Sequence, residues 1–249
     1  MMTSMLKTLK RLCAVALFAP ALSLAAPASG ALDSAPVSTD PASLQHGAKL
    51  FVNYCLNCHS ASFMRYNKME EIGLTDQDIL DNFIFREEGA VGDLMTISMR
   101  PDESSTWFGT APPDLTLVAL QRAGHLTSGA DWLYTYMRTF YRDPSRPTGW
   151  NNVVFENVGM PHAFWELQGD QVAVRDDNGD VVGVELVREG RMSPDEYDQA
   201  VADLVSFLVW MAEPHAESRK QIGLFVLLFI AGFTILAYAL KKNYWKDIH

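Results

Sequence analysis

Two cysteines and a histidine within five consecutive residues are the densest group of reactive side chains in the sequence. Cys55 and Cys58 are separated by two residues, and His59 follows directly. Two thiols at this spacing can add to the two vinyl groups of one haem, and the next histidine is then directed at the haem iron. The spacing therefore predicts covalent haem attachment, with His59 as one axial ligand.

Other chemistries of paired cysteines need surroundings that this sequence does not offer. A thioredoxin-like redox pair belongs to a βαβ pattern, which is absent around Cys55. A disulfide between Cys55 and Cys58 is compatible with an oxidising compartment. A zinc site needs four ligands, commonly from a second close pair. The remaining histidines are scattered and form no such pair: His46, His125, His162, His215 and His249.

The second axial position decides what such a haem can do. A methionine closes the iron and raises its reduction potential, which suits electron transfer, whereas an open site suits ligand binding or catalysis. We predict Met160, because Gly159 and Pro161 place it in a loop where the backbone can approach closely. Two alternatives stay open: this methionine packs on nearby aromatic residues, or His125 or His162 is the ligand.

Haem propionates need cations, and Arg122 is the candidate. A guanidinium group matches a carboxylate with two parallel hydrogen bonds. Arg122 follows the sequence Pro112-Pro113-Asp114-Leu115 and precedes a predicted helix. A solvated surface arginine fits the sequence equally well.

Helices and a loop must position these residues. Asp40-Pro41 predicts a helix start, and apolar residues at helical spacing continue to Cys55. Thr75 can cap a second short helix. Residues 86–113 are rich in Gly, Pro, Ser and Thr and predict a loop, whereas residues 130–141 predict a third helix.

The second half of the chain contains a hairpin and a long helix. Residues 144–168 are irregular and aromatic-rich. Asn178-Gly179 lies between alternating apolar residues, which predicts a small β-hairpin. Ser193 and Glu196 form a capping box that opens a helix, and Pro214 interrupts it.

Two apolar segments predict export and a membrane anchor. Basic residues, a short apolar stretch and small residues make residues 1–25 a signal peptide, followed by a flexible leader over residues 26–42. Residues 222–240 are uncharged and long enough to span a bilayer. The haem domain, residues 43–221, would then be periplasmic, and the lysine-rich tail, residues 241–249, cytoplasmic. The sequence thus predicts a single-pass protein of the bacterial inner membrane.

The excess of acidic residues limits the classes of partner. The formal net charge is −10. An acidic surface repels nucleic acid and favours association with a basic protein.

The ordered set of motifs resembles the cytochrome c1 family, the haem c subunit of quinol:cytochrome c reductase (the cytochrome bc1 complex). The resemblance rests on the Cys55–His59 motif, on Pro112–Leu115 with Arg122 downstream, on Gly159-Met160, and on residues 210–223 before the anchor. It implies a mainly α, cytochrome c-like haem domain with long loop insertions and a small β-hairpin, plus one C-terminal transmembrane helix.

The same resemblance implies site roles. It implies one covalent haem c on Cys55 and Cys58, with axial ligands His59 and Met160 and with Arg122 near a propionate.

The resemblance also implies a function and partners. The chain would pass one electron at a time from the Rieske iron–sulfur protein to a c-type cytochrome, with cytochrome b and membrane lipid as its neighbours. It would act as an electron-transfer subunit and would not be catalytic alone. The alternatives are a membrane-tethered cytochrome c that donates to a terminal oxidase, and a haem peroxidase or sensor.

Overall fold

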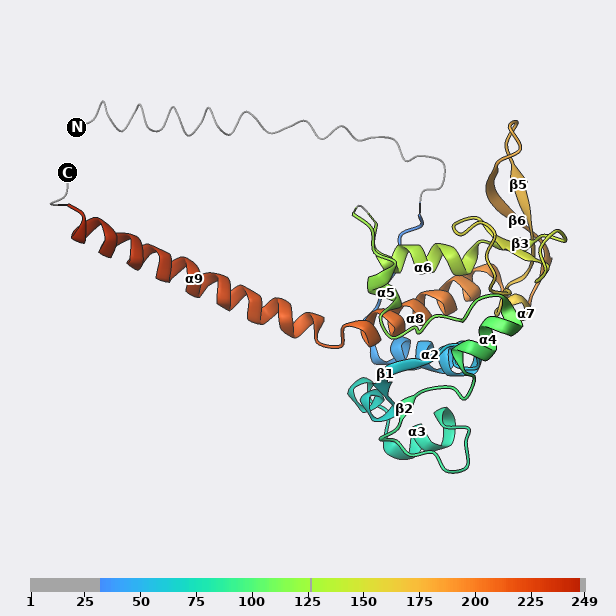
Figure 1. The fold of residues 1–249 in the computed structure, drawn as a ribbon, viewed down its shortest axis with the longest axis horizontal. Helices are drawn as coiled ribbons and strands as arrows, with labels where there is room; N and C mark the ends of the chain where they lie inside the picture. Colours follow the sequence, from blue (N-terminus) through green and yellow to red (C-terminus); the bar gives the residue numbers. More distant parts are fainter. Residues whose placement is uncertain (1–31, 126, 247–249) are drawn as a thin grey trace. The chain divides into compact units, whose positions relative to one another are not determined.

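The computed structural model describes residues 32–125 and 127–246. The expected signal peptide, residues 1–25, lies outside the described residues, as does the start of the expected leader. Within the described part, helices dominate and three two-stranded sheets accompany them (Figure 1).

The helix that carries the haem-binding motif begins and ends where the sequence predicted. α2 (Pro41–Leu50) starts at Asp40, whose carboxylate accepts hydrogen bonds from the N–H groups of Ala42 and Ser43. It continues into one π-helical turn, η1 (Phe51–Cys55). Cys55 therefore lies at the last position of this continuous helix.

A second helix holds α2 in place. α8 (Pro194–Ala212) opens with the predicted capping box, in which Ser193 and Glu196 bond each other's backbone N–H. Gly47 of α2 faces α8 so closely that an added Cβ would lie 2.0 Å from the carbonyl oxygen of Asp203. Because no side chain fits at Gly47, the two helices pack backbone against backbone at this point.

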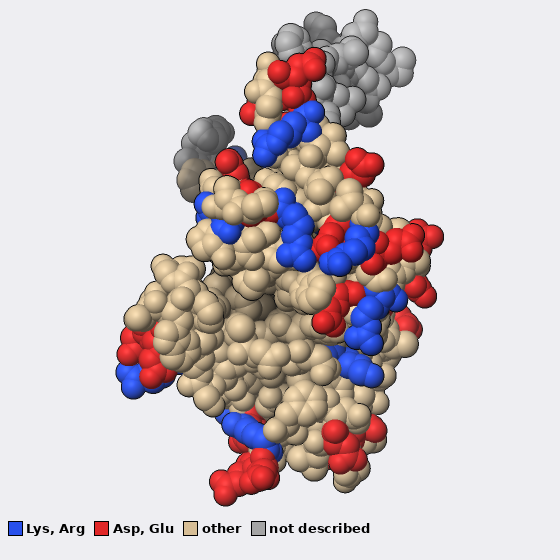
Figure 2. Space-filling view, turned by 90° about the vertical axis from the view of Figure 1, so that its right-hand side faces the viewer, with Lys and Arg blue, Asp and Glu red and all other residues tan. Residues whose placement is uncertain are grey.

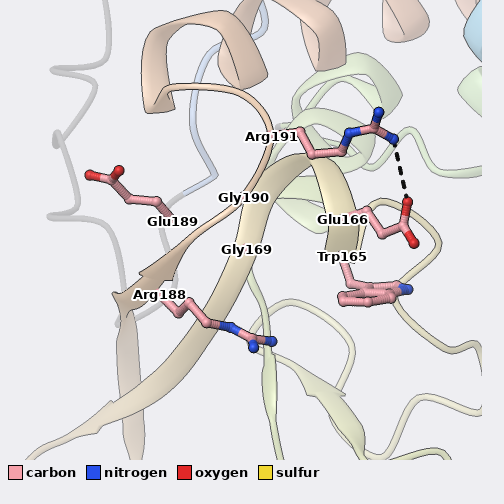
Figure 3. Close-up of a pocket in the computed structure, with 7 residues that line it drawn as sticks. All are labelled: Trp165, Glu166, Gly169, Arg188, Glu189, Gly190 and Arg191. Atoms are coloured by element: carbon pink, nitrogen blue, oxygen red, sulfur yellow. Dashed lines mark ion pairs between the residues drawn. The ribbon is translucent and has the colours of Figure 1, made fainter.

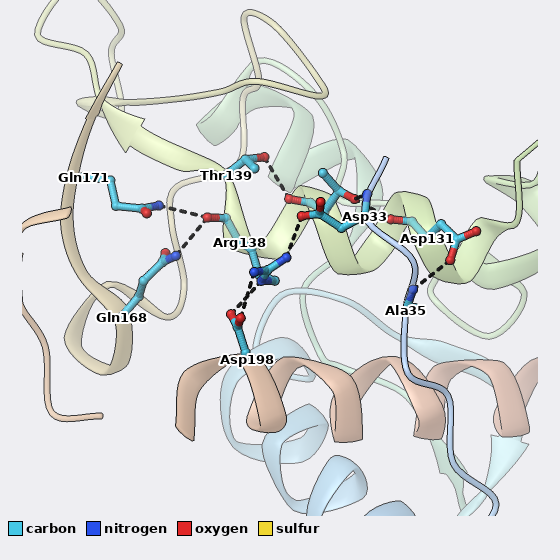
Figure 4. A network of polar contacts seen from close by, with 9 residues as sticks. Asp33, Ala35, Asp131, Arg138, Thr139, Gln168, Gln171 and Asp198 are labelled. Carbon is cyan, nitrogen blue, oxygen red and sulfur yellow. Dashed lines mark hydrogen bonds and ion pairs between the residues drawn. The ribbon is translucent and has the colours of Figure 1, made fainter. Parts of the chain in front are cut away.

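The residues before α2 differ from the flexible leader expected over residues 26–42. Residues 32–40 have no helix or strand, but the segment 33–38, here called the strap, is bonded to α6 (Gly129–Arg138), as Figure 4 shows, and also to α8. The N–H groups of Asp33, Ala35 and Ser38 donate to the Thr135 hydroxyl, the Asp131 carboxylate and the Ser206 hydroxyl at 2.7, 2.8 and 2.9 Å. These bonds fix the strap, and its Pro/Ala/Ser composition does not reveal them.

The segment after the haem-binding motif forms a small sheet and two short helices. β1 (Ala61–Arg65) pairs antiparallel with β2 (Leu94–Met95). η2 (Tyr66–Ile72) and α3 (Asp76–Phe83) lie between the strands in sequence, and Thr75 caps α3 as predicted.

The loop expected over residues 86–113 is wrong in part, because it contains β2 and α4 (Pro101–Phe108). Proline at the first position and acidic residues in the first turn favour this helix. Gly109 ends it with φ of 76°. The prediction of a loop used the Gly, Pro, Ser and Thr content of the whole segment and therefore missed these local helix signals.

The third helix is shorter than expected. Residues 130–141 were predicted, but α6 ends at Arg138, and Phe140–Arg142 (β3) pairs with Trp150–Asn152 (β4). Because Phe140 and Tyr141 pair with β4, they cannot continue the helix. The short helices α5 (Val118–Gln121) and α7 (Trp165–Gln168) flank this region in sequence.

The predicted hairpin and anchor helix are both present. β5 (Gly169–Arg175) and β6 (Val181–Glu189) pair antiparallel, and Gly179 in their turn has φ of 89°. Helix α9 (Ala216–Tyr244) contains the expected span 222–240, and none of its residues is buried. It is long and apolar enough to cross a membrane.

Candidate haem site

The two cysteines lie on a tight turn at the end of η1. The N–H groups of Cys58 and His59 both donate to the carbonyl of Cys55, at 3.0 and 2.9 Å. Cys55 is buried, Cys58 is exposed, and both thiols are free. Burial, reinforced by the neighbouring Cys58, raises the pKa of the Cys55 thiol to about 12.

His59 is oriented by the loop that carries Pro113. Its Nδ1 lies 2.7 Å from the Pro113 carbonyl oxygen, so Nδ1–H donates and Nε2 is left as the ligand atom. Burial lowers the pKa of His59, against the opposing effects of the Pro113 hydrogen bond and the Asp114 charge. The imidazole is therefore favoured in the neutral form that binds iron.

Asp114 ties the same loop to the turn after the motif. Its carboxylate accepts hydrogen bonds from the N–H of Ser62, at 2.7 Å, and from both the N–H and the hydroxyl of Thr116. The N–H of Leu115 donates to the Ser60 carbonyl at 2.9 Å. Burial alone would raise the pKa of Asp114, but the Thr116 and Ser62 hydrogen bonds outweigh it, and the pKa is lowered. Sequence reasoning noted these residues only as a motif and missed their role.

The residues on either side of Met160 lie close to segments that neighbour the haem-binding motif. At Gly159, an added Cβ would lie 3.7 Å from Thr110, three residues before Pro113. Phe164, on the other side of Met160 in sequence, packs edge-on against Tyr54 with ring centroids 4.8 Å apart. Since Tyr54 precedes Cys55, the structure brings the two predicted ligand segments into one region.

Met160 is partly buried, and its sulfur has a hydrogen-bond donor. The hydroxyl of Tyr136 on α6 lies 3.3 Å from Met160 Sδ. Burial raises the pKa of the Tyr136 phenol above its ordinary range. The sequence placed Tyr136 only on the apolar stripe of a helix.

Arg122 joins the same region through aromatic rings. Its guanidinium carbon lies 4.3 Å from the Trp132 ring centroid, and Trp132 stacks on Tyr136 at 4.8 Å. In the described residues no carboxylate forms an ion pair with it. The guanidinium therefore keeps its hydrogen-bonding capacity beside the Met160 region.

The two histidines considered as alternative ligands differ in exposure. His125 is exposed. His162 is 1% exposed, lies flat on Phe140 with centroids 4.8 Å apart, and is nearly perpendicular to the Trp150 ring. Burial lowers the pKa of His162 to about 4. This histidine is thus packed among aromatic rings of the β3–β4 region.

The described residues also line two surface cavities. One, of about 330 Å³, is lined by residues of α7, β5 and β6, including Trp165 and Arg188, and by Gly190 and Arg191 directly after β6 (Figure 3). The second, of about 530 Å³, is lined by His46, Tyr54 and five other residues. Figure 2 also shows a hollow with uncharged walls on one face of the molecule.

Comparison with known proteins decides the family. The model of the Cytochrome C1 family matches residues 33–248. The chain belongs to the cytochrome c1 family. It is 45% identical to cytochrome c1 of Allochromatium vinosum over 241 residues, which cover 94% of this chain and 96% of that protein. Cytochrome c1 of Rhodospirillum rubrum is 26% identical over 84% of this chain and 83% of its own length.

A further relative carries a different name. The protein called ammonia monooxygenase gamma subunit of Nitrosomonas europaea is 45% identical over 245 residues, which cover 98% of this chain and all of that protein. It is as similar to this chain as the Allochromatium protein is.

Membership confirms the resemblance, the fold class and the cofactor predicted from the sequence. A cytochrome c1 binds one covalently attached haem c and is the electron-carrying subunit of the bc1 complex. Covalent haem c needs two free thiols and a histidine with a free ring nitrogen, and this chain has both in Cys55, Cys58 and His59. The described residues therefore fit haem c.

Proposed function

We propose that Cys55 and Cys58 form the thioether bonds to haem c and that His59 Nε2 and Met160 Sδ are its axial ligands. The observation that carries this proposal is the hydrogen bond from His59 Nδ1 to Pro113, directly after two free thiols. It leaves only Nε2 to bind iron. We further propose that Arg122 binds a propionate, because its charge is held by Trp132 and has no ion-pair partner in the described part.

Each of these residues has a definable task. Bound haem c supplies a one-electron iron couple. The thioether of Met160 would raise the potential of that couple and would leave no place for an external ligand to bind. Buried Phe164 lies four residues beyond Met160 and packs against Tyr54, which helps keep water from the site.

The reaction and the direct partners are also proposals. Electrons would arrive from the Rieske iron–sulfur protein and leave to a c-type cytochrome, so that quinol:cytochrome c oxidoreductase activity belongs to the assembled complex. Cytochrome b and lipid would surround α9. The net charge of −10 favours a basic acceptor.

The proposed location is the bacterial inner membrane, with the haem domain in the periplasm. The support is the apolar helix α9, which carries Lys241 and Lys242 in its last turn and is followed directly by Trp245. Basic residues favour the cytoplasmic side of a span, and tryptophan favours the interface.

A substitution of Met160 tests the ligand assignment. Met160→Leu should retain covalent haem, seen by haem staining of a denaturing gel, because the thioethers are untouched. The ferric spectrum should become high-spin, the ferrous form should bind CO, and the potential should fall. Met137→Leu is the matched control, since Met137 is a buried methionine of α6 that is not among the proposed ligands. An unchanged spectrum in Met160→Leu would exclude Met160 as a ligand.

Purification tests the partners. Cytochrome b and the Rieske protein should accompany the chain in mild detergent. A haem-stained chain that purifies without either of them would favour a tethered carrier instead.

A further inference from the structure

The Tyr136 hydroxyl makes one hydrogen bond in the described part of the chain, to the sulfur of Met160. The oxygen–sulfur distance is 3.3 Å, across 24 residues of sequence. Tyr136 is 8% exposed, so water competes little for the hydroxyl. A thioether sulfur is a weak acceptor, and a buried phenol with no better acceptor can still donate to it.

The rest of the Tyr136 side chain is fixed by its neighbours. Its ring stacks on Trp132 with centroids 4.8 Å apart and meets the edge of Phe140 at 5.0 Å. Its backbone carbonyl accepts a hydrogen bond from Asn152 Nδ2 at 2.7 Å. The ring is thus held by two aromatic neighbours and the backbone is tied to β4, so the position of the hydroxyl is fixed.

A methionine sulfur has two lone pairs. If one lone pair binds iron, the other is available to the hydroxyl. Donation from the hydroxyl draws electron density from the sulfur, which weakens its donation to ferric iron more than to ferrous iron. The reduced state is then favoured.

We propose that Tyr136 is a positioning residue that holds Met160 Sδ in the loaded protein and raises the reduction potential of the haem. This inference rests on the ligation by Met160 proposed above. It assigns to Tyr136 a role that the family motifs do not contain, since the residue lies outside all of them.

The test compares two tyrosines on the same helix in the purified complex. Tyr136→Phe removes the hydroxyl and keeps the ring contacts. Tyr134→Phe is the control, because Tyr134 is equally buried but lies under the Arg138 guanidinium, 4.6 Å from ring centroid to carbon, and makes no bond to Met160. We expect Tyr136→Phe to lower the potential by up to about 59 mV, a tenfold change in the one-electron equilibrium. The near-infrared band that reports the sulfur–iron bond should shift, and Tyr134→Phe should change neither quantity.

Equal potentials and bands in Tyr136→Phe and the unaltered complex would overturn the inference. A second measurement needs no variant. Exchange into D2O replaces the hydroxyl proton, and the resonance Raman band of the sulfur–iron bond should shift, so that an unshifted band also counts against it. Met160→Leu separates the two proposals: if it loses the near-infrared band while Tyr136→Phe has no effect, the ligation stands and the role of Tyr136 fails. If Met160→Leu keeps the band, both fail.

Discussion

One hydrogen bond holds each of the two proposed axial ligands. In His59 it involves the ring nitrogen that does not bind iron, and in Met160 it involves the sulfur itself. The Pro113 carbonyl accepts from His59 Nδ1, and the Tyr136 hydroxyl donates to Met160 Sδ. Such outer contacts fix ring tautomer and ligand orientation and tune the metal. At the scale of single residues, the site therefore depends on groups other than the ligands themselves.

The charge of Arg122 should be measurable in the potential of the haem. A nearby positive charge disfavours the ferric state, so Arg122→Gln should lower the potential, by about 59 mV for a tenfold shift. Arg122→Lys keeps the charge and should restore part of the difference. Arg100→Gln is the control, because it removes the same charge from an exposed pair with Asp102. A redox titration in which Arg122→Gln behaves like Arg100→Gln would remove Arg122 from the site.

At the scale of elements, the contact between α2 and α8 positions the haem-binding motif. Phe51 and Phe207 pack with ring centroids 5.6 Å apart, beside the point where Gly47 meets Asp203. Only glycine fits at position 47, because an added Cβ would overlap the backbone carbonyl of Asp203. The position of Cys55 thus depends on a residue eight positions earlier.

A single methyl group at Gly47 should disturb this contact. Gly47→Ala forces α2 from α8, and overpacking of this kind costs about 1–3 kcal/mol. The free energy of unfolding of the haem-loaded protein, from denaturant titration, is the measurement. Gly92→Ala provides the comparison, because an added Cβ at Gly92 meets nothing within 4 Å. Similar losses in both variants would contradict the close packing of α2 on α8.

The capping box of α8 should contribute stability that depends on pH. Ser193→Ala should lower the free energy of unfolding by about 1 kcal/mol near neutral pH. Hydrogen bonds from Ser193 lower the pKa of Glu196. A carboxylate with a lowered folded pKa stabilises the fold above its ordinary pKa, and this contribution is lost as the pH falls through the folded value.

Thermal unfolding at several pH values checks this prediction. Glu196→Gln should show a weaker loss of stability on acidification than the unaltered protein. If the difference in stability between Glu196→Gln and the unaltered protein is the same at every pH, the charge of the Glu196 carboxylate does not contribute to stability.

The elements predicted correctly are those with local signals. Asp40, Thr75 and Ser193 each cap the helix that follows, because their side chains bond N–H groups two or three residues away. The end of α6 could not be read in this way, since it is set by pairing of Phe140–Arg142 with a strand ten residues later. The same limit applies to the site. The Cys55–His59 spacing is local, whereas the contacts of Pro113 and Tyr136 join segments that only the fold brings together.

At the scale of the whole molecule, α9 makes no buried contact with the rest of the described chain. A chain that ends at His215 should therefore keep its haem spectrum and melting temperature and should partition into the soluble fraction. It loses one exposed ion pair, between Arg219 and Glu213, which contributes little. Haem staining of soluble and membrane fractions is the measurement. Loss of haem from the truncated chain would show that α9 supports the folded domain.

The strap sets an order of events during biogenesis. Ser38 bonds Ser206, 168 residues further on, and Asp33 bonds Thr135, 102 residues further on. A polypeptide is synthesised from its N-terminus, so these early residues are made long before their partners on α6 and α8. The docking of the strap can therefore be completed only after α8 has been made, and it is one of the last steps of folding.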